Sequence, residues 1–139
     1  MNKNHILRVA DAIEQRTIEN LGFNMAVTFA RYDGQYADQS GHDCGTIACI
    51  AGWSVAFREQ DRYGEVSVSR MAATLEEYGG NVLDDARVWL GLDTDRADAL
   101  FYGRHHPSGS INSISVSEAV RTLRHLAETG KVDWEACRD

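Results

Sequence analysis

The sequence lacks the features that mark membrane, secreted and disulfide-rich proteins. Its longest apolar run extends only from Ile47 to Trp53, far short of the roughly 20 residues that a membrane-spanning helix needs, so no membrane association is expected. No charged segment followed by an apolar one opens the chain, which argues against secretion. The three cysteines are an odd, sparse set, and the single proline is Pro107. We therefore predict a cytoplasmic protein with reduced thiols.

An excess of positive charge is also missing. The chain of 139 residues has 14 Lys and Arg against 21 Asp and Glu, a net charge of −7 with a pI near 5.1. Because a protein that follows a phosphate backbone needs a basic stripe, direct nucleic-acid binding is not expected. The same charge favours a partner protein with a basic surface.

What the sequence does contain is the composition of one globular domain, residues 1–139, with 43% apolar and 25% charged residues. Apolar residues recur at helical spacing between polar ones along most of the chain. The pattern predicts an all-α fold, a compact single-domain bundle of about six short helices with room for a minor extended segment at 65–69. The predicted helices cover 4–20, 45–58, 69–78, 81–90, 94–102 and 115–129.

Local signals fix several of these boundaries. Ser115 and Glu118 have the spacing of a capping box, Gly130 is placed to end the last helix, and Trp134 is expected to pack behind it. Thr94 is expected to cap the start of the helix predicted over 94–102. The stretch 23–30 alternates with period two but carries small and polar partners, so it is compatible with a strand or a short helix.

The helix predicted over 45–58 is expected to be central and buried. A stripe of small residues runs through it at steps of three and four. A glycine at position 52 costs roughly 1 kcal/mol relative to alanine inside a helix, which close packing by a neighbouring backbone would offset. The stripe consists of Gly45, Ala48, Cys49, Gly52 and Ala56.

Cys44 is the candidate nucleophile, because it would directly precede this central helix. The free amides and positive dipole of a helix start stabilise a thiolate, and His42, His105 or His106 could act as the base. The string Asp43-Cys44-Gly45-x-x-x-Cys49 resembles the nucleophile motif of SUMO-specific (Ulp-type) cysteine proteases over about seven residues. Those enzymes have a larger domain with a sheet and place the catalytic histidine well before the cysteine. The competing interpretation is a capping thiol that becomes buried.

The same histidines and cysteines could supply metal ligands. His42, Cys44 and Cys49 with His105 or His106 would offer nitrogen and sulfur donors. However, Cys-x₄-Cys across a helix start lacks the Cys-x₂-Cys knuckle of structural zinc sites. We therefore expect no metal and no other cofactor.

A longer resemblance spans nearly the whole chain. Phe23-x-Met25, Cys44-Gly-Thr-x-x-Cys49-Ile-Ala-Gly-Trp53, Leu90-Gly-Leu92 with Ala99-Leu-Phe101, and Leu126-Ala-x-x-Gly130-x-Val-Asp-Trp134 resemble a family of small bacterial and bacteriophage proteins of unassigned function. The resemblance implies a shared fold and a phage or mobile-element setting inside a host cell. It implies no reaction and no catalytic residue.

The leading hypothesis is a small acidic phage-type accessory protein that binds a host protein stoichiometrically, as an anti-defence inhibitor does, and blocks a basic site that normally holds nucleic acid. One alternative is a cysteine hydrolase or transferase that uses Cys44. Another is a sponge for a small anionic signal molecule, bound near Arg121 and Arg124. Neither the identity of the partner nor the oligomeric state is indicated by the sequence.

Overall fold

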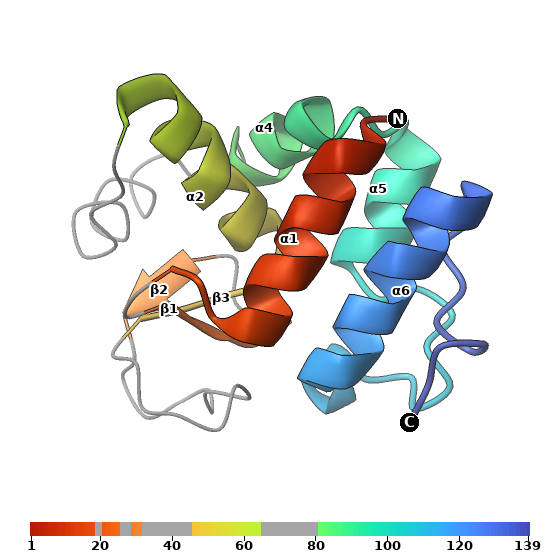
Figure 1. The fold of residues 1–139 in the computed structure, drawn as a ribbon. Coiled ribbons are helices and arrows are strands. Elements are labelled where there is room, and N and C mark those ends of the chain that lie inside the picture. The colour runs from red at the N-terminus through yellow and green to blue at the C-terminus, as the bar shows by residue number, and fades with distance from the viewer. Residues whose placement is uncertain (19–20, 26–28, 32–45, 65–80) are drawn as a thin grey trace.

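The computed structural model describes residues 1–18, 21–25, 29–31, 46–64 and 81–139, and these ranges are predominantly helical, as predicted (Figure 1). They contain five α-helices, one short 3₁₀ helix and a small sheet. The helices are α1 (Lys3–Gln15), α2 (Ile50–Tyr63), α4 (Asn81–Leu90), α5 (Thr94–Phe101) and α6 (Val116–Thr129), with the 3₁₀ helix η1 at Ile111–Ser113. The strands are β1 (Leu21–Phe23), β2 (Phe29–Arg31) and β3 (Thr46–Ala48).

The sheet is an addition to the predicted helical bundle. β3 lies between the other two strands, parallel to β1 and antiparallel to β2. Leu21 pairs with Thr46, and Phe29 pairs with Ala48. The stretch 23–30 thus contributes the end of one strand and the start of another. The partner strand lies fifteen or more residues further along the chain, so local spacing could not reveal the pairing.

The start predicted for the central helix is wrong. α2 begins at Ile50 with Cys49 as its N-cap, because Thr46 to Ala48 extend the sheet instead. The first eight residues of α2 are all buried, as expected of a helix that is apolar on every side. The Trp53 indole N–H donates to the carbonyl of Gly22 at 3.0 Å, which ties α2 to the sheet.

α1 packs against α2, α4 and α6. Its buried face is built from Ile6, Val9, Ala10 and Ile13. The helix ends at Gln15, before the predicted end at 20, because Arg16 adopts a left-handed conformation with φ 53°.

The carboxyl-terminal part follows its predicted signals closely. Asp93, rather than Thr94, caps α5 by accepting from the amide of Arg96. The capping box at the start of α6 and the left-handed Gly130 at its end are confirmed. After Gly130 the chain turns back along α6 (Figure 1), and the buried Trp134 donates its indole N–H to the carbonyl of Ala99 at 2.9 Å.

Two predictions fall outside the described residues, namely the extended segment at 65–69 and the helix at 69–78. Within the described ranges, no helix is both long enough and apolar enough to span a bilayer.

Gly64 and Gly91 both have a positive φ, but only at Gly91 would an added Cβ also crowd neighbouring atoms. A Cβ on Gly91 (φ +70°) would lie 2.9 Å from the amide nitrogen of Asn2, whereas Gly64 (φ +83°) faces open space. We expect Gly64→Ala to lower the free energy of unfolding by about 1 kcal/mol. Gly91→Ala adds an overpacking term and is expected to lower it by at least about 2 kcal/mol. Urea unfolding of both variants measures the difference, and equal losses would contradict the predicted crowding at position 91.

Thr122 offers a route to higher stability. Its hydroxyl on α6 is fully buried and has no hydrogen-bond partner in the described part of the chain. Because a buried hydroxyl without a partner is costly, we expect Thr122→Val to raise the free energy of unfolding by about 1 kcal/mol. Thr129→Val is the matched control, since the Thr129 hydroxyl donates to the carbonyl of His125. Thermal unfolding should show an increase for the first variant and none for the second.

Candidate functional site

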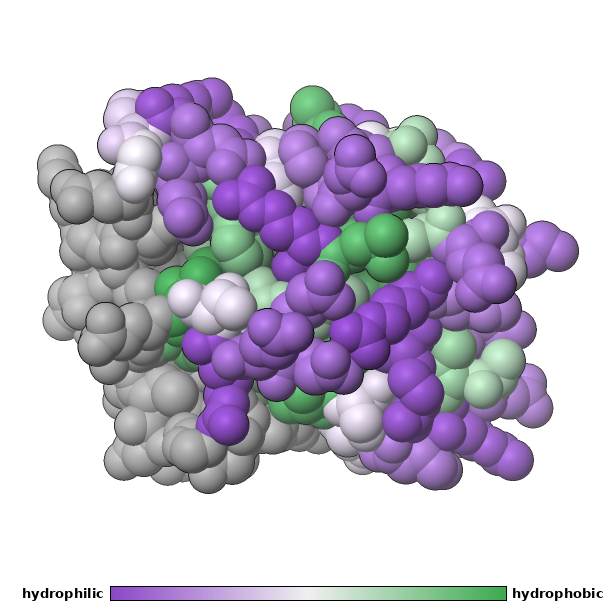
Figure 2. Space-filling view, viewed as in Figure 1, coloured by the Kyte–Doolittle hydropathy of each residue, from purple (hydrophilic) through white to green (hydrophobic). Residues whose placement is uncertain are grey.

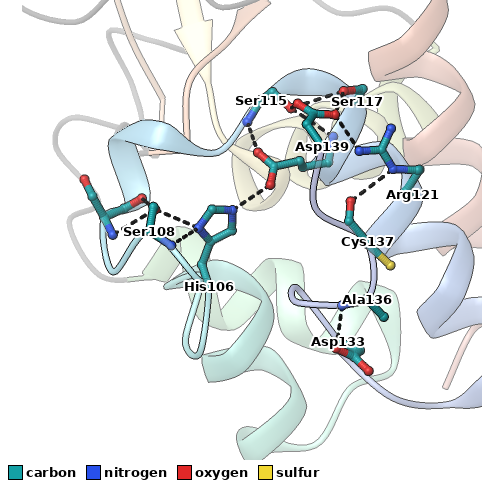
Figure 3. A network of polar contacts seen from close by, with 11 residues as sticks. His106, Ser108, Ser115, Ser117, Arg121, Asp133, Ala136, Cys137 and Asp139 are labelled. Carbon is teal, nitrogen blue, oxygen red and sulfur yellow. Dashed lines mark hydrogen bonds and ion pairs between the residues drawn. The ribbon is translucent and has the colours of Figure 1, made fainter.

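A network of polar side chains surrounds the first turns of α6 (Figure 3). Three segments contribute to it. His106 and Ser108 come from the loop before α6, while Ser115, Glu118 and Arg121 belong to α6 or its cap. The third segment is the C-terminal stretch, which supplies the backbone carbonyl of Cys137 and the side chain of Asp139.

His106 and Glu118 form the buried centre of this network. The two residues are 8% and 5% exposed, and the imidazole Nε2 lies 2.8 Å from Glu118 Oε2. The other carboxylate oxygen, Oε1, accepts the backbone N–H of Ser115 at 3.0 Å. The edge of the His106 ring also meets the indole of Trp134, with the centroids 5.9 Å apart. One carboxylate therefore fastens the loop to the helix start.

The tautomer of His106 follows from its contacts. The backbone N–H of Ser108 donates to Nδ1 at 3.2 Å, so Nδ1 is an acceptor and Nε2 carries the proton that goes to Glu118. The Ser108 hydroxyl lies 2.7 Å from the same Nδ1 and 3.1 Å from the carbonyl oxygen of Ser110. A serine, a histidine and a glutamate are thus connected in series.

This series differs from a nucleophilic triad. In a triad the base must be able to take the proton of the hydroxyl, and nearby donors must stabilise an oxyanion. Here the amide of Ser108 shares the Nδ1 lone pair, and the Ser108 hydroxyl also accepts the amide N–H of Ser110 at 3.2 Å. The contacts close the loop on itself, so we interpret them as holding the loop.

Several hydrogen bonds stabilise the ionised form of Glu118. Burial by itself raises the pKa of this carboxyl, but the N–H of Ser115 and the imidazole of His106 outweigh burial and hold the pKa below its ordinary value. The pKa of Asp139 is also lowered. Its carboxylate accepts from Ser115, Ser117 and Arg121, which keep its pKa well below the usual range.

Four residues were predicted as candidates for chemistry at Cys44. His106 is buried in the network above, and His105 is exposed with a left-handed φ of 66°. His42 and Cys44 lie outside the described residues. The structure does show that α2 begins at Ile50, so the residue at the helix start is Cys49, five positions after Cys44.

Cys49 shows what that helix start does to a thiol. The backbone N–H groups of Gly52 and Ala51 favour its thiolate, yet complete burial outweighs them and raises the pKa of Cys49. The local reason for expecting an activated thiol at Cys44, a position directly before α2, therefore does not hold in this fold.

The sequence also suggested residues that could bind a metal or an anion. No group of three His, Cys, Asp or Glu side chains suited to a metal occurs among the described residues. Arg121 and Arg124, predicted as a local anion-binding cluster, are both engaged. Arg121 contacts Asp139, and Arg124 contacts Asp11 and Glu14 of α1 at 2.9 Å. An anionic signal molecule would have to displace these carboxylates.

Most described carboxylates contact an arginine side chain, and Glu118 contacts the imidazole of His106. The pairs are Arg8–Asp61, Arg58–Glu59, Arg58–Asp85, Arg87–Asp84, Arg96–Asp93, Arg104–Asp98, Arg121–Asp139, Arg124–Asp11, Arg124–Glu14 and His106–Glu118. Within the described ranges, four carboxylates form no ion pair: Asp95, Glu128, Asp133 and Glu135.

Sequence reasoning missed the role of Glu118 beyond the cap and the burial of His106. The spacing of Ser115 and Glu118 predicts the capping box, but nothing in the sequence indicates that the second carboxylate oxygen binds a histidine twelve residues earlier. The serine- and glycine-rich loop around Pro107 was the available signal, since such loops hydrogen-bond to their own side chains.

We expect Glu118→Gln to lower the free energy of unfolding by about 2 kcal/mol at pH 7, because a buried charge-assisted hydrogen bond is lost. The folded pKa of Glu118 is lowered, so its contribution is present above the ordinary value of 4.5 and is lost as the pH falls through the folded pKa. The deficit of the variant should therefore shrink in acid. Denaturant unfolding at pH 7 and pH 3 measures it, with Glu128→Gln as control. A deficit that does not change with pH would contradict this assignment.

Comparisons with protein-family models, with curated proteins and with solved structures find no match for this chain. The resemblance of nearly the whole chain to small bacterial and bacteriophage proteins of unassigned function therefore stays a prediction.

Proposed function

We propose that the protein acts by stoichiometric binding, docking through unpaired carboxylates on the basic surface of a partner protein. The observation that supports this most directly is that four described carboxylates form no ion pair and lie within five residues, along the chain, of Arg96 or Gly130, which are joined by a hydrogen bond. These four, Asp95, Glu128, Asp133 and Glu135, are called the acidic end. In the phage-like setting that the sequence suggests, such a partner is a host protein whose basic site holds nucleic acid.

One hydrogen bond joins the two parts of the chain that carry these carboxylates. Arg96 Nε donates to the carbonyl oxygen of Gly130 at 2.7 Å, so the start of α5 lies against the end of α6. Asp95 is adjacent to Arg96 in the chain, and Glu128 lies two residues before Gly130. Asp133 and Glu135 follow on the same return of the chain, while Lys131 offsets one of the four charges.

The electrostatics of these residues suit docking. Asp95, Glu128 and Glu135 are exposed, and a partner cation can meet them without breaking an ion pair inside the protein. The remaining described carboxylates would first have to exchange an arginine or, in the case of Glu118, the imidazole of His106. The view in Figure 2 shows a largely hydrophilic surface over the described residues, with small and separate apolar areas. Such a surface favours charge-led association over an apolar docking patch.

The two alternatives gain less support. For a nucleophilic Cys44, the base His106 would have to leave Glu118 and Ser108, which contact both of its ring nitrogens. For a sponge, Arg121 and Arg124 would have to release Asp139, Asp11 and Glu14. A cysteine mechanism that used His106, and a sponge that used Arg121 and Arg124, would therefore begin with the loss of existing contacts, whereas docking on the acidic end breaks no ion pair.

The test is capture of host proteins at 50 mM and 300 mM NaCl, followed by titration of the captured protein by calorimetry. We expect a complex of fixed stoichiometry whose Kd rises at least about tenfold at the higher salt concentration. The combined variant Asp95→Asn, Glu128→Gln, Asp133→Asn and Glu135→Gln should lose this binding while its thermal stability changes little, because none of the four carboxylates forms an ion pair.

The matched control neutralises Asp84 and Asp85 of α4, which are paired with Arg87 and Arg58. This control is expected to keep the partner. Undiminished binding by the fourfold variant, or no captured protein at 50 mM NaCl, would overturn the proposal.

A further inference from the structure

The C-terminal segment 131–139, the strap, is attached to the described chain in an unusual way. It follows the left-handed Gly130 and returns along α6 towards that helix's start (Figure 1). Every hydrogen bond between the strap and the described helices involves a side chain, and none joins two backbones. The strap can therefore leave without breaking a helix or a strand.

Arg121 holds the strap at two points. Its Nε donates to the carbonyl oxygen of Cys137 at 3.0 Å, and its Nη2 binds the carboxylate of Asp139 (Figure 3). The hydroxyls of Ser115 and Ser117 hold the same carboxylate. The side chains of Arg121 and Asp139 are 45% and 53% exposed, so water and salt weaken this contact.

The inner side of the strap carries two buried residues. Trp134 is 1% exposed and Cys137 is 7% exposed. The other described cysteine, Cys49, belongs to the junction of β3 and α2, at a distance in the chain and on different elements. Exposure of Cys137 thus reports on the strap, and exposure of Cys49 reports on the core.

We propose that the strap detaches from α6 as a unit while the helices stay folded, and that the contacts of the Arg121 guanidinium hold it in place. Segments held by few contacts and without backbone ladders open at a lower free energy than the whole domain. Here the opening costs the burial of Trp134 and Cys137, the hydrogen bond from Trp134 to Ala99 and a small set of partly exposed polar contacts.

Detachment of the strap would change the acidic surface of the protein. Asp133 and Glu135, half of the acidic end, are carried by the strap, whereas Asp95 and Glu128 belong to α5 and α6. Release of the strap would separate the two pairs of carboxylates. The strap itself is inferred from its attachments and holds whether or not a partner binds there.

The test measures alkylation of each cysteine by iodoacetamide under native conditions, resolved by mass spectrometry of the peptides. We expect Arg121→Ala to raise the labelling rate of Cys137 at least about fivefold and to leave that of Cys49 unchanged. Comparison of variant with wild type at each site removes differences in intrinsic thiol reactivity. In the wild type, 0.5 M NaCl should raise the rate at Cys137 alone.

The matched control is Arg124→Ala, which removes ion pairs to α1 from the same helix without touching the strap. Asp139→Asn provides a second way to weaken the contact between Arg121 and the strap. Tryptic cleavage after Lys131 needs an extended strap and should rise in parallel with labelling. Equal increases at Cys137 and Cys49 would show global unfolding, and labelling of Cys137 with Lys131 still protected would show fraying of the last residues only. Either outcome overturns the proposal.

Discussion

The first turn of α6 is the point on which the carboxyl-terminal half of the structure depends. The Ser115 hydroxyl accepts the amide of Glu118 and donates to Asp139, while the two oxygens of Glu118 bind the amide of Ser115 and the imidazole of His106. A helix cap, a loop and the C-terminal strap are therefore joined through four residues, Ser115, Glu118, His106 and Asp139. Because helix starts always present unpaired N–H groups, this turn has become the natural place to fasten two segments that lack regular structure.

Charge is divided unevenly along the chain. The described ranges contain fourteen acidic and thirteen basic residues, a balance of −1, whereas the remaining ranges contain seven acidic residues and Arg70, a balance of −6. In the described part, arginines neutralise most carboxylates and join elements, as Arg124 joins α6 to α1. The few carboxylates left without a cation there are thus selected by the packing, and net charge alone could not have identified them.

The sequence predicted elements well where a local signal marks the boundary. Ser115, Glu118 and Gly130 bracket α6, because capping groups act within one turn of the helix. It failed where the deciding contact is distant. Thr46 to Ala48 have small and β-branched residues that fit a helix or a strand, and only the backbones of β1 and β2 decide between them. The pairing of His106 with Glu118 was hidden for the same reason.

The shift of one helix boundary changes the chemistry that the sequence suggested. A helix from 45 would put Cys44 beside free amides, where a thiolate is stabilised. In the structure Cys49 has that place, and burial more than cancels the effect of the amides on its pKa. The helix dipole acts on a thiol only within the first turn, so five residues are enough to remove the argument. The start of α2 therefore gives no reason of its own to expect a thiolate at Cys44, and of the histidines considered with it, His106 is already bound to Glu118 and Ser108.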